Sequence, residues 1–221
     1  MTLSPEPGYD LYAPSYKDDH PHLDSFDWDQ ARAWLRQTLE ATATKPTLLD
    51  AGCGDGRTLA RVARWELTSQ LFGVDISRAM LARAAKRVAG AQFDRLDLTN
   101  VDACRRWVER RTRVNILTAF FVLVHFSRPE VFFDSLGSLV QPGGEVLMNS
   151  IPQREAPILK AGTRRFQIQA YHHDPDRIQD YGLAAGWQLV RRQDLVEDTQ
   201  LVSTLFWWRI PTGTSPTATS L

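Results

Sequence analysis

The chain has 221 residues, of which 43% are hydrophobic and 24% charged, enough apolar material to bury the core of one compact domain. Its 26 basic and 26 acidic residues cancel, so no overall charge attracts it to nucleic acid or to an anionic membrane. No apolar stretch is long enough to span a bilayer, no signal peptide begins the chain, and two cysteines do not make a disulfide framework. We therefore expect a cytoplasmic protein with small-molecule partners, present as a monomer or homodimer.

The N-terminal part of the chain predicts a helix ahead of the main fold. A stretch rich in Pro, Asp, His and Tyr is followed by apolar residues at helical spacing, namely Trp28, Ala31, Leu35 and Leu39. Beyond residue 46, short apolar runs alternate with helical patterns. This alternation predicts a mainly parallel sheet covered by helices on both faces.

A strand that breaks into a glycine turn is the most informative feature of the sequence. The apolar residues 47–49 lead into Asp-Ala-Gly-Cys-Gly-Asp-Gly at residues 50–56, and a helix is predicted from residue 57 to about residue 65. Alternate glycines let the backbone turn tightly and approach a ligand, while the helix directs free N–H groups and a positive dipole end toward it. Asp75 ends the next predicted strand, where an acid can accept hydrogen bonds from two ribose hydroxyls. This unit indicates a nucleotide-like cofactor.

Two other nucleotide-binding motifs fit the turn less well. A dinucleotide fingerprint needs its third glycine where Arg57 stands, and a P-loop needs glycine in place of Ala51 and lysine in place of Arg57. A Tyr-x-x-x-Lys pair is also absent from the sequence. These departures disfavour an NTPase and an NAD-linked reductase, and the reductase is kept as an alternative.

The turn resembles the first motif of the class I S-adenosylmethionine (SAM)-dependent methyltransferases, Asp-x-Gly-x-Gly-x-Gly, which holds the amino-acid end of SAM. Four later segments resemble further motifs of this family in the same order, at residues 75–81, 93–98, 114–125 and 139–148. The resemblance covers about residues 46 to 150 and implies SAM as the cofactor. It implies an α/β fold with a Rossmann-like, doubly wound, seven-stranded and mainly parallel sheet, a C-terminal antiparallel hairpin and an N-terminal helical lid.

The resemblance also implies roles for individual residues. Asp75 would bind the ribose, Ile76 would pack on the adenine, and Asp97 would accept from the adenine amino group. Tyr16 belongs to a tyrosine cluster that resembles a leader folding over SAM, and Phe120 leaves the fourth predicted strand toward the cofactor. The cofactor-binding residues expected in this way are Tyr16, Asp50, Gly52, Gly54, Gly56, Asp75, Ile76, Asp97, Leu98 and Phe120.

Two histidines are candidate general bases. A hydroxyl or acid acceptor benefits from a base, whereas a deprotonated amine does not need one. His125 follows the fourth predicted strand on the side where ligands bind, and His172 ends the stretch that relatives use to shape the acceptor pocket. Structural roles stay open for both: a hydrogen bond to loop backbone for His125, and a solvated junction for His172. No spacing of His, Asp or Cys indicates a metal site.

The expected organisation is a lid and leader helix at residues 1–45, a SAM-binding domain at 46–210 with an acceptor-pocket insertion near 151–173, and a disordered tail at 211–221. The implied function is methyl transfer from SAM to an O or N atom of a small molecule such as a natural-product intermediate. The alternatives are a SAM-binding protein with a non-methylating role, as a cyclase or partner subunit, and the NAD-linked reductase. Nucleic-acid methylation is disfavoured because the Asp/Asn-Pro-Pro-Tyr/Phe motif is absent after the fourth predicted strand.

Overall fold

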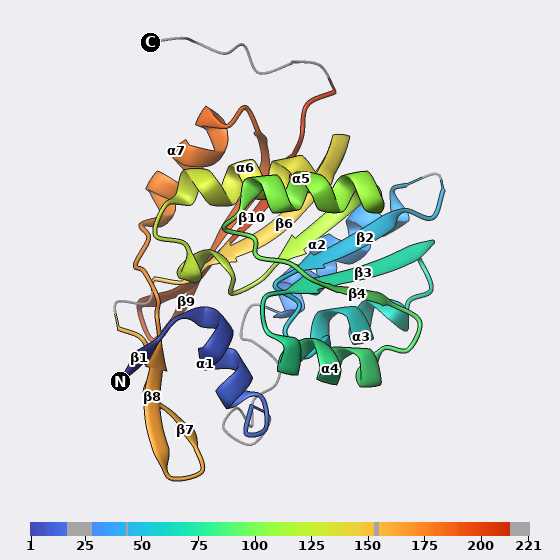
Figure 1. Cartoon of the computed structure of the whole chain (residues 1–221). Helices are drawn as coiled ribbons and strands as arrows, with labels where there is room; N and C mark the ends of the chain where they lie inside the picture. The colour runs from blue at the N-terminus through green and yellow to red at the C-terminus, as the bar shows by residue number, and fades with distance from the viewer. Residues whose placement is uncertain (17–27, 43, 153–154, 213–221) are drawn as a thin grey trace.

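A seven-stranded sheet forms the centre of the protein, for which a computed structural model describes residues 1–16, 28–42, 44–152 and 155–212. Its strands are β2 (Thr47–Ala51), β3 (Gln70–Asp75), β4 (Gln92–Arg95), β5 (Val114–Ala119), β6 (Val140–Ser150), β9 (Gln188–Glu197) and β10 (Gln200–Arg209). Their order across the sheet is β4-β3-β2-β5-β6-β10-β9 (Figure 1). The five strands from β4 to β6 are parallel, and β10 runs antiparallel to both β6 and β9. The expected doubly wound sheet with a C-terminal antiparallel hairpin is therefore confirmed.

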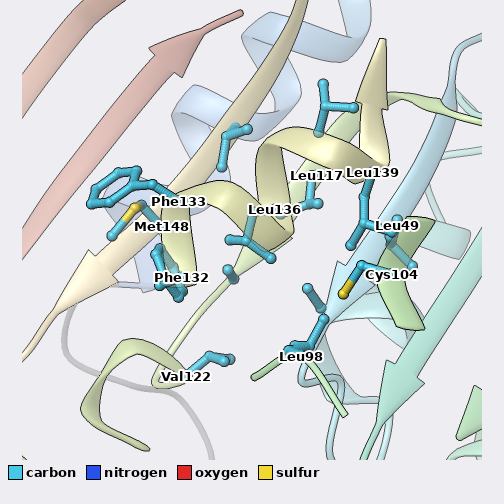
Figure 2. Packing of buried hydrophobic residues seen from close by; sticks show 14 of the residues in the cluster. Leu49, Leu98, Cys104, Leu117, Val122, Phe132, Phe133, Leu136, Leu139 and Met148 are labelled. Atoms are coloured by element: carbon cyan, nitrogen blue, oxygen red, sulfur yellow. The ribbon is translucent and has the colours of Figure 1, made fainter. Parts of the chain in front are cut away.

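Helices cover both faces of this sheet. They are α2 (Trp28–Glu40), α3 (Arg57–Ala63), α4 (Arg78–Arg87), α5 (Val101–Arg110), α6 (Pro129–Leu139) and α7 (Pro175–Ala184), with a short 3-10 helix η1 (Leu123–His125) after β5. Successive strand residues point to opposite faces, so Leu49 packs under α5 and α6, while Leu48 packs with α2 and α3. Figure 2 shows the first of these clusters, where Leu136 and Leu139 of α6 face Leu49 and Leu117 of the sheet.

The N-terminal residues attach to a second, smaller sheet that the sequence did not indicate. Here β1 (Thr2–Leu3) pairs in parallel with β8 (Arg164–Ile168), which pairs antiparallel with β7 (Leu159–Ala161). Helix α1 (Pro5–Tyr12) lies beside β8 (Figure 1). The contact is close because Gly8 has no side chain: an added Cβ would lie 2.7 Å from Ile168 Cγ1. Tyr12 is buried against Phe166 and Ile168 in a satellite core of this region.

The boundaries differ in part from those expected. Helix α3 ends at Ala63 rather than near residue 65, and a turn follows in which Glu66 adopts a left-handed conformation with φ 55°. In the C-terminal hairpin, strand β9 continues to Glu197, close to the turn that leads into β10. Residues 17–25 of the predicted lid and residues 213–221 of the predicted tail lie outside the described residues. Within the described parts, no helix combines the length and apolarity needed to cross a membrane.

Candidate active site

The glycines of the turn between β2 and α3 serve two purposes. Gly52, Gly54 and Gly56 all have positive φ, at 70°, 53° and 80°. An added Cβ on Gly52 would lie 2.4 Å from Val122 Cγ2, and one on Gly56 would lie 3.1 Å from Ala84 Cα, so these two glycines allow close packing. A Cβ on Gly54 would meet only a methionine methyl at 3.8 Å. Gly54 therefore leaves space for a ligand rather than for the protein.

Asp75 at the end of β3 fixes the conformation of this turn. Its Oδ2 accepts a hydrogen bond from the Gly54 N–H at 2.8 Å, and its Oδ1 accepts one from the Ser77 N–H at 2.9 Å. Burial raises the pKa of the carboxyl group, and hydrogen bonds from the backbone of Ser77, Gly54 and Ile76 oppose that shift. Each carboxylate oxygen has a second lone-pair site, so Asp75 can still accept hydrogen bonds from a ligand.

Asp50 at the end of β2 is a second buried carboxyl group at the same edge of the sheet. It is 3% exposed, and the Thr118 hydroxyl donates to its Oδ1 at 2.7 Å. Burial is the largest cause that raises its pKa from 3.8 to about 7, and the nearby Asp75 charge acts in the same direction. A cationic group of a ligand would be stabilised by the ionised form of this side chain.

Arg57, which occupies the place of a dinucleotide-binding glycine, ties the turn to the N-terminal segment. Its guanidinium lies 3.3 Å from the buried carboxylate of Asp55, which also pairs with Arg87 at 2.9 Å. On its other side it donates to the Tyr16 hydroxyl at 2.6 Å and lies 5.0 Å from the centre of that ring. Arg57 thus holds Tyr16 at the cavity.

One cavity of about 520 Å³ connects these groups, a volume typical of sites for small molecules and cofactors. Of the predicted site residues, the following line it: Tyr16, Asp50, Gly52, Gly54, Asp75, Ile76, Asp97, Leu98, Phe120 and His125. Gly56 packs against α4 behind the turn. His172 is exposed at the surface and does not line the cavity. The neighbouring His173 bonds to the carbonyl of Phe126 at 2.8 Å, which gives it a structural contact.

His125 lies in η1 and is held between two partners. Its Nδ1 lies 2.8 Å from the Gln169 carbonyl oxygen, and its Nε2 lies 2.8 Å from the Tyr9 hydroxyl oxygen. A carbonyl can only accept, so Nδ1 carries the proton and donates it, while the Nε2 lone pair accepts from the Tyr9 O–H. Burial lowers the pKa of His125, which favours the neutral form that this arrangement requires.

Helix α1 forms one wall of the cavity and is fastened to the cofactor side by polar contacts. Asp10 Oδ1 accepts from the Ser77 hydroxyl at 2.6 Å and from the Ala79 N–H at 3.1 Å. Glu6 forms an ion pair with Arg95. These contacts join residues 67 to 89 positions apart, and no local pattern in the sequence indicates them.

The described residues contain no group of three or more His, Cys, Asp or Glu side chains that could hold a metal ion. Both cysteines, Cys53 and Cys104, are buried and free. Burial raises the pKa of the Cys53 thiol, so this group stays neutral although it lines the cavity.

Comparison with known proteins agrees with the geometry. Residues 48–144 match the family model of a methyltransferase domain. Trans-aconitate 2-methyltransferase of Acidovorax ebreus (strain TPSY) is 34% identical over 88 residues, which cover 34% of this chain and 33% of that protein. The chain thus matches about a third of the length of this relative.

Solved structures share the whole fold at low identity. The cyclase SpnF superposes with a TM-score of 0.67 at 18% identity, covering 96% of this chain and 99% of that one. Magnesium protoporphyrin IX methyltransferase from Synechocystis PCC 6803, solved with SAM bound, gives a TM-score of 0.59 at 18% identity, covering 92% and 91%. Likeness at this identity establishes the fold and leaves the reaction open.

The sheet order and the glycine turn give this chain the fold of the class I SAM-dependent methyltransferases, and residues 48–144 match a methyltransferase domain. The cofactor of that class is SAM. The residues fit that cofactor, because the open space over Gly54 admits a ligand against the backbone and Asp75 retains acceptor sites toward the cavity.

Proposed function

We propose that this protein transfers a methyl group from SAM to an oxygen or nitrogen atom of a small, largely uncharged molecule. The observation that carries the proposal is the single cavity that runs from the glycine turn and Asp75 to His125. Beyond the cofactor residues, its walls are mainly apolar, with the side chains of Pro5, Val124, Phe126, Ile151, Pro157, Leu159, Ile168 and Ala170. A cofactor and an acceptor would therefore meet in one apolar space.

In this proposal the residues of the turn hold SAM. The backbone at Gly52 and Gly54 and the carboxylate of Asp50 bind its amino-acid end, and Asp75 binds the ribose. Ile76 and Leu98 pack on the adenine, and the exposed carboxylate of Asp97 accepts from its amino group. SAM supplies a methyl group on a sulfonium, which is intrinsically transferable to a nucleophile. The protein then has to orient the acceptor and exclude water, an effect worth several kcal/mol.

The charges on the cavity wall favour a neutral acceptor over a polycarboxylate. Among the described lining residues, the only Arg or Lys side chains are Arg57 and Arg61, both on α3 at the cofactor end. Arg57 is engaged by Asp55 and Tyr16, and the Arg61 guanidinium lies 4.5 Å from the centre of the Trp28 ring. A tricarboxylate such as the acceptor named for the Acidovorax relative would meet no further cation on these walls. Arg164 and Arg165 are exposed and do not line the cavity.

The experiment that tests the proposal measures S-adenosylhomocysteine (SAH) release from SAM with a panel of acceptors. We expect turnover with neutral phenols, alcohols or amines of moderate size, and little with trans-aconitate. The variant Asp75→Asn should bind SAM at least about tenfold more weakly, because a buried carboxylate that accepts ribose hydroxyls is lost. Exclusive turnover of trans-aconitate would refute the acceptor class.

A non-methylating role is the second candidate, because the fold neighbour SpnF is described as a cyclase. A protein of that kind would bind SAM or SAH without consuming it. Tight SAM binding with no SAH release on any acceptor, together with conversion of a substrate by ring closure, would favour this candidate. Thermal-shift measurements with SAM, SAH and NAD address the reductase alternative, because only a bound ligand raises the apparent stability.

A further inference from the structure

Tyr9 and His125 form a hydrogen-bonded pair inside the cavity, although 116 positions separate them in the chain. The Tyr9 oxygen lies 2.8 Å from His125 Nε2, and the two rings meet edge to face with centroids 5.4 Å apart. Both side chains line the cavity, whose walls are mainly apolar. The pair is therefore placed to meet a ligand in the cavity.

The direction of the hydrogen bonds defines a path for a proton. The Gln169 carbonyl fixes the His125 proton on Nδ1, so the Nε2 lone pair faces the Tyr9 hydroxyl and accepts from it. The Tyr9 oxygen keeps lone pairs of its own, which can accept a hydrogen bond from an acceptor hydroxyl in the cavity. If His125 gains a proton at Nε2, the Gln169 carbonyl still accepts from Nδ1 and stabilises the imidazolium.

We propose that Tyr9 and His125 act as one proton relay that deprotonates a hydroxyl acceptor during methyl transfer. The proposal rests on the proposed function and narrows it, because an oxygen acceptor of phenol or alcohol type is the class that needs such a relay. As the acceptor oxygen bonds to the methyl carbon, the carbon–sulfur bond breaks and its electron pair stays on sulfur. The acceptor proton passes to the Tyr9 oxygen, and the Tyr9 phenolic proton passes to His125 Nε2. The products are the methyl ether, SAH and a protonated His125, which later releases its proton to water.

The relay exists only while α1 is in place. Tyr9 is on that helix, next to Asp10, which bonds to the Ser77 hydroxyl beside the predicted ribose-binding carboxylate. Docking of α1 would thus complete the acceptor wall and supply the relay at the same time. Deprotonation of an acceptor would then require the docked position of α1.

A purely structural role for the pair, as a fastener of α1, makes a different prediction about acceptor acidity. A relay matters most for a weakly acidic acceptor such as phenol, with a pKa of about 10, and little at about pH 8 for para-nitrophenol, which is largely ionised at that pH. A fastener would affect both acceptors equally. The ratio of the two effects therefore separates chemistry from packing.

The kinetic test compares SAH release with phenol and para-nitrophenol at saturating SAM in Tyr9→Phe and His125→Gln. We expect kcat with phenol to fall about 100-fold or more in each variant, and kcat with para-nitrophenol to fall less than about tenfold. The double variant should be no worse than either single one, because the residues act as a unit. Tyr171→Phe is the matched control: its hydroxyl accepts from the Gln169 side chain at 2.5 Å outside the cavity wall, so kcat should stay unchanged. His172→Gln is the equivalent histidine control.

Equal losses on the two phenols, or no loss on either, would overturn the relay while leaving the methyltransferase proposal intact. Absence of SAH release by the unmodified protein on every acceptor would instead contradict the proposed function. Calorimetric SAM affinity and melting temperature, measured on each variant, identify a variant that has lost its fold.

A second measurement needs no acceptor and reports on the relay directly. In the 15N NMR spectrum of the full chain with SAH, His125 should show a protonated Nδ1 and an unprotonated Nε2, and Tyr9→Phe should shift the Nε2 resonance. A His125 protonated at Nε2 in the neutral form, or insensitivity of Nε2 to Tyr9→Phe, would refute the arrangement.

Discussion

Replacing Asp50 by Asn should make the protein more stable and less able to bind SAM. The folded protein holds this carboxyl group at 3% exposure with a pKa raised from 3.8 to about 7, so its ionised form is disfavoured by folding. Because folding raises the pKa of this acid, ionisation of Asp50 destabilises the folded protein. This destabilisation is absent below the pKa of Asp50 in the unfolded chain, grows as the pH rises, and is complete above about pH 7. Because each tenfold change in an ionisation constant is worth about 1.4 kcal/mol, the full cost is about 4 kcal/mol.

In Asp50→Asn, the side chain at position 50 carries no charge at any pH and can still accept a hydrogen bond from the Thr118 hydroxyl. In urea unfolding without ligand, we expect it to exceed the wild type by about 4 kcal/mol at about pH 8.5, and by less than half of that at about pH 5. Asp134→Asn, which removes an exposed carboxylate on α6, is the control and should change stability little at either pH. Equal stabilities of Asp50→Asn and wild type at both pH values would refute the reasoning.

The same carboxyl group should couple SAM binding to pH. If the ionised form pairs with the ammonium group of SAM, binding must remove the proton from Asp50 wherever it is protonated. Near pH 7, about half of the groups carry a proton, so SAM binding should release about 0.5 proton per site. Calorimetry in buffers of different ionisation enthalpy measures this release, which should be absent in Asp50→Asn. A wild-type value of zero would contradict the assigned contact.

Three further predictions test the turn, the docking of α1 and the relay. Gly52→Ala should lower the unfolding free energy by about 2 to 3 kcal/mol, because its Cβ would collide with Val122. Gly54→Ala should mainly weaken SAM binding, by about tenfold or more, because its Cβ would occupy the space left for the ligand. Melting curves measure the first effect and calorimetry the second, and a reversed pattern would contradict the two assignments. Asp10→Ala should weaken SAM binding by about 1 to 2 kcal/mol through loss of its bonds to α4, and unchanged calorimetric affinity would show that α1 docks independently of the cofactor. In the pH profile of kcat at saturating SAM and acceptor, where Asp50 is already paired with SAM, activity should fall on the acid side with a midpoint below 6.5, because burial lowers the pKa of His125 and only the neutral form accepts a proton. A midpoint above 6.5 would refute this assignment.

The parts of the fold that the sequence predicted depend on local patterns. Apolar runs and helical spacing give the strands and helices from β2 to β6, and the glycine turn with Asp75 gives the cofactor edge, because strand, turn and acid follow one another closely along the chain. The sheet order then follows from a resemblance that covers the same segment. Positions of the cofactor residues around one cavity agree with that expectation, while their binding roles stay predictions.

The contacts that the sequence did not predict are those between distant segments. Nothing near Tyr9 indicates a bond to His125, and nothing near Asp10 indicates that it bonds to the start of α4. Pairing of β1 with β8 brings these residues into place, and a two-residue strand is too short to recognise by alternation. In the sequence, Arg57 only argued against a dinucleotide site, because its side chain stands where that motif needs a glycine. The structure adds a role that the sequence did not predict, since the guanidinium links the turn to Tyr16.

Burial disfavours the charged forms of both Asp50 and His125. In each case the disfavoured charge helps the proposed reaction. A protein selected only for stability would replace the carboxyl group by an amide, whereas a carboxylate that is costly alone gains most from a cationic ligand. His125 is kept neutral in the same way, ready to accept one proton, and its partner arrives on α1. The apolar wall that disfavours the charged forms of these groups also keeps water from competing for the methyl group. The apolar residues of this cavity thus shift the pKa values of its titratable groups and also exclude water. A substitution that makes the wall more polar should reduce the pKa shifts and the exclusion of water together.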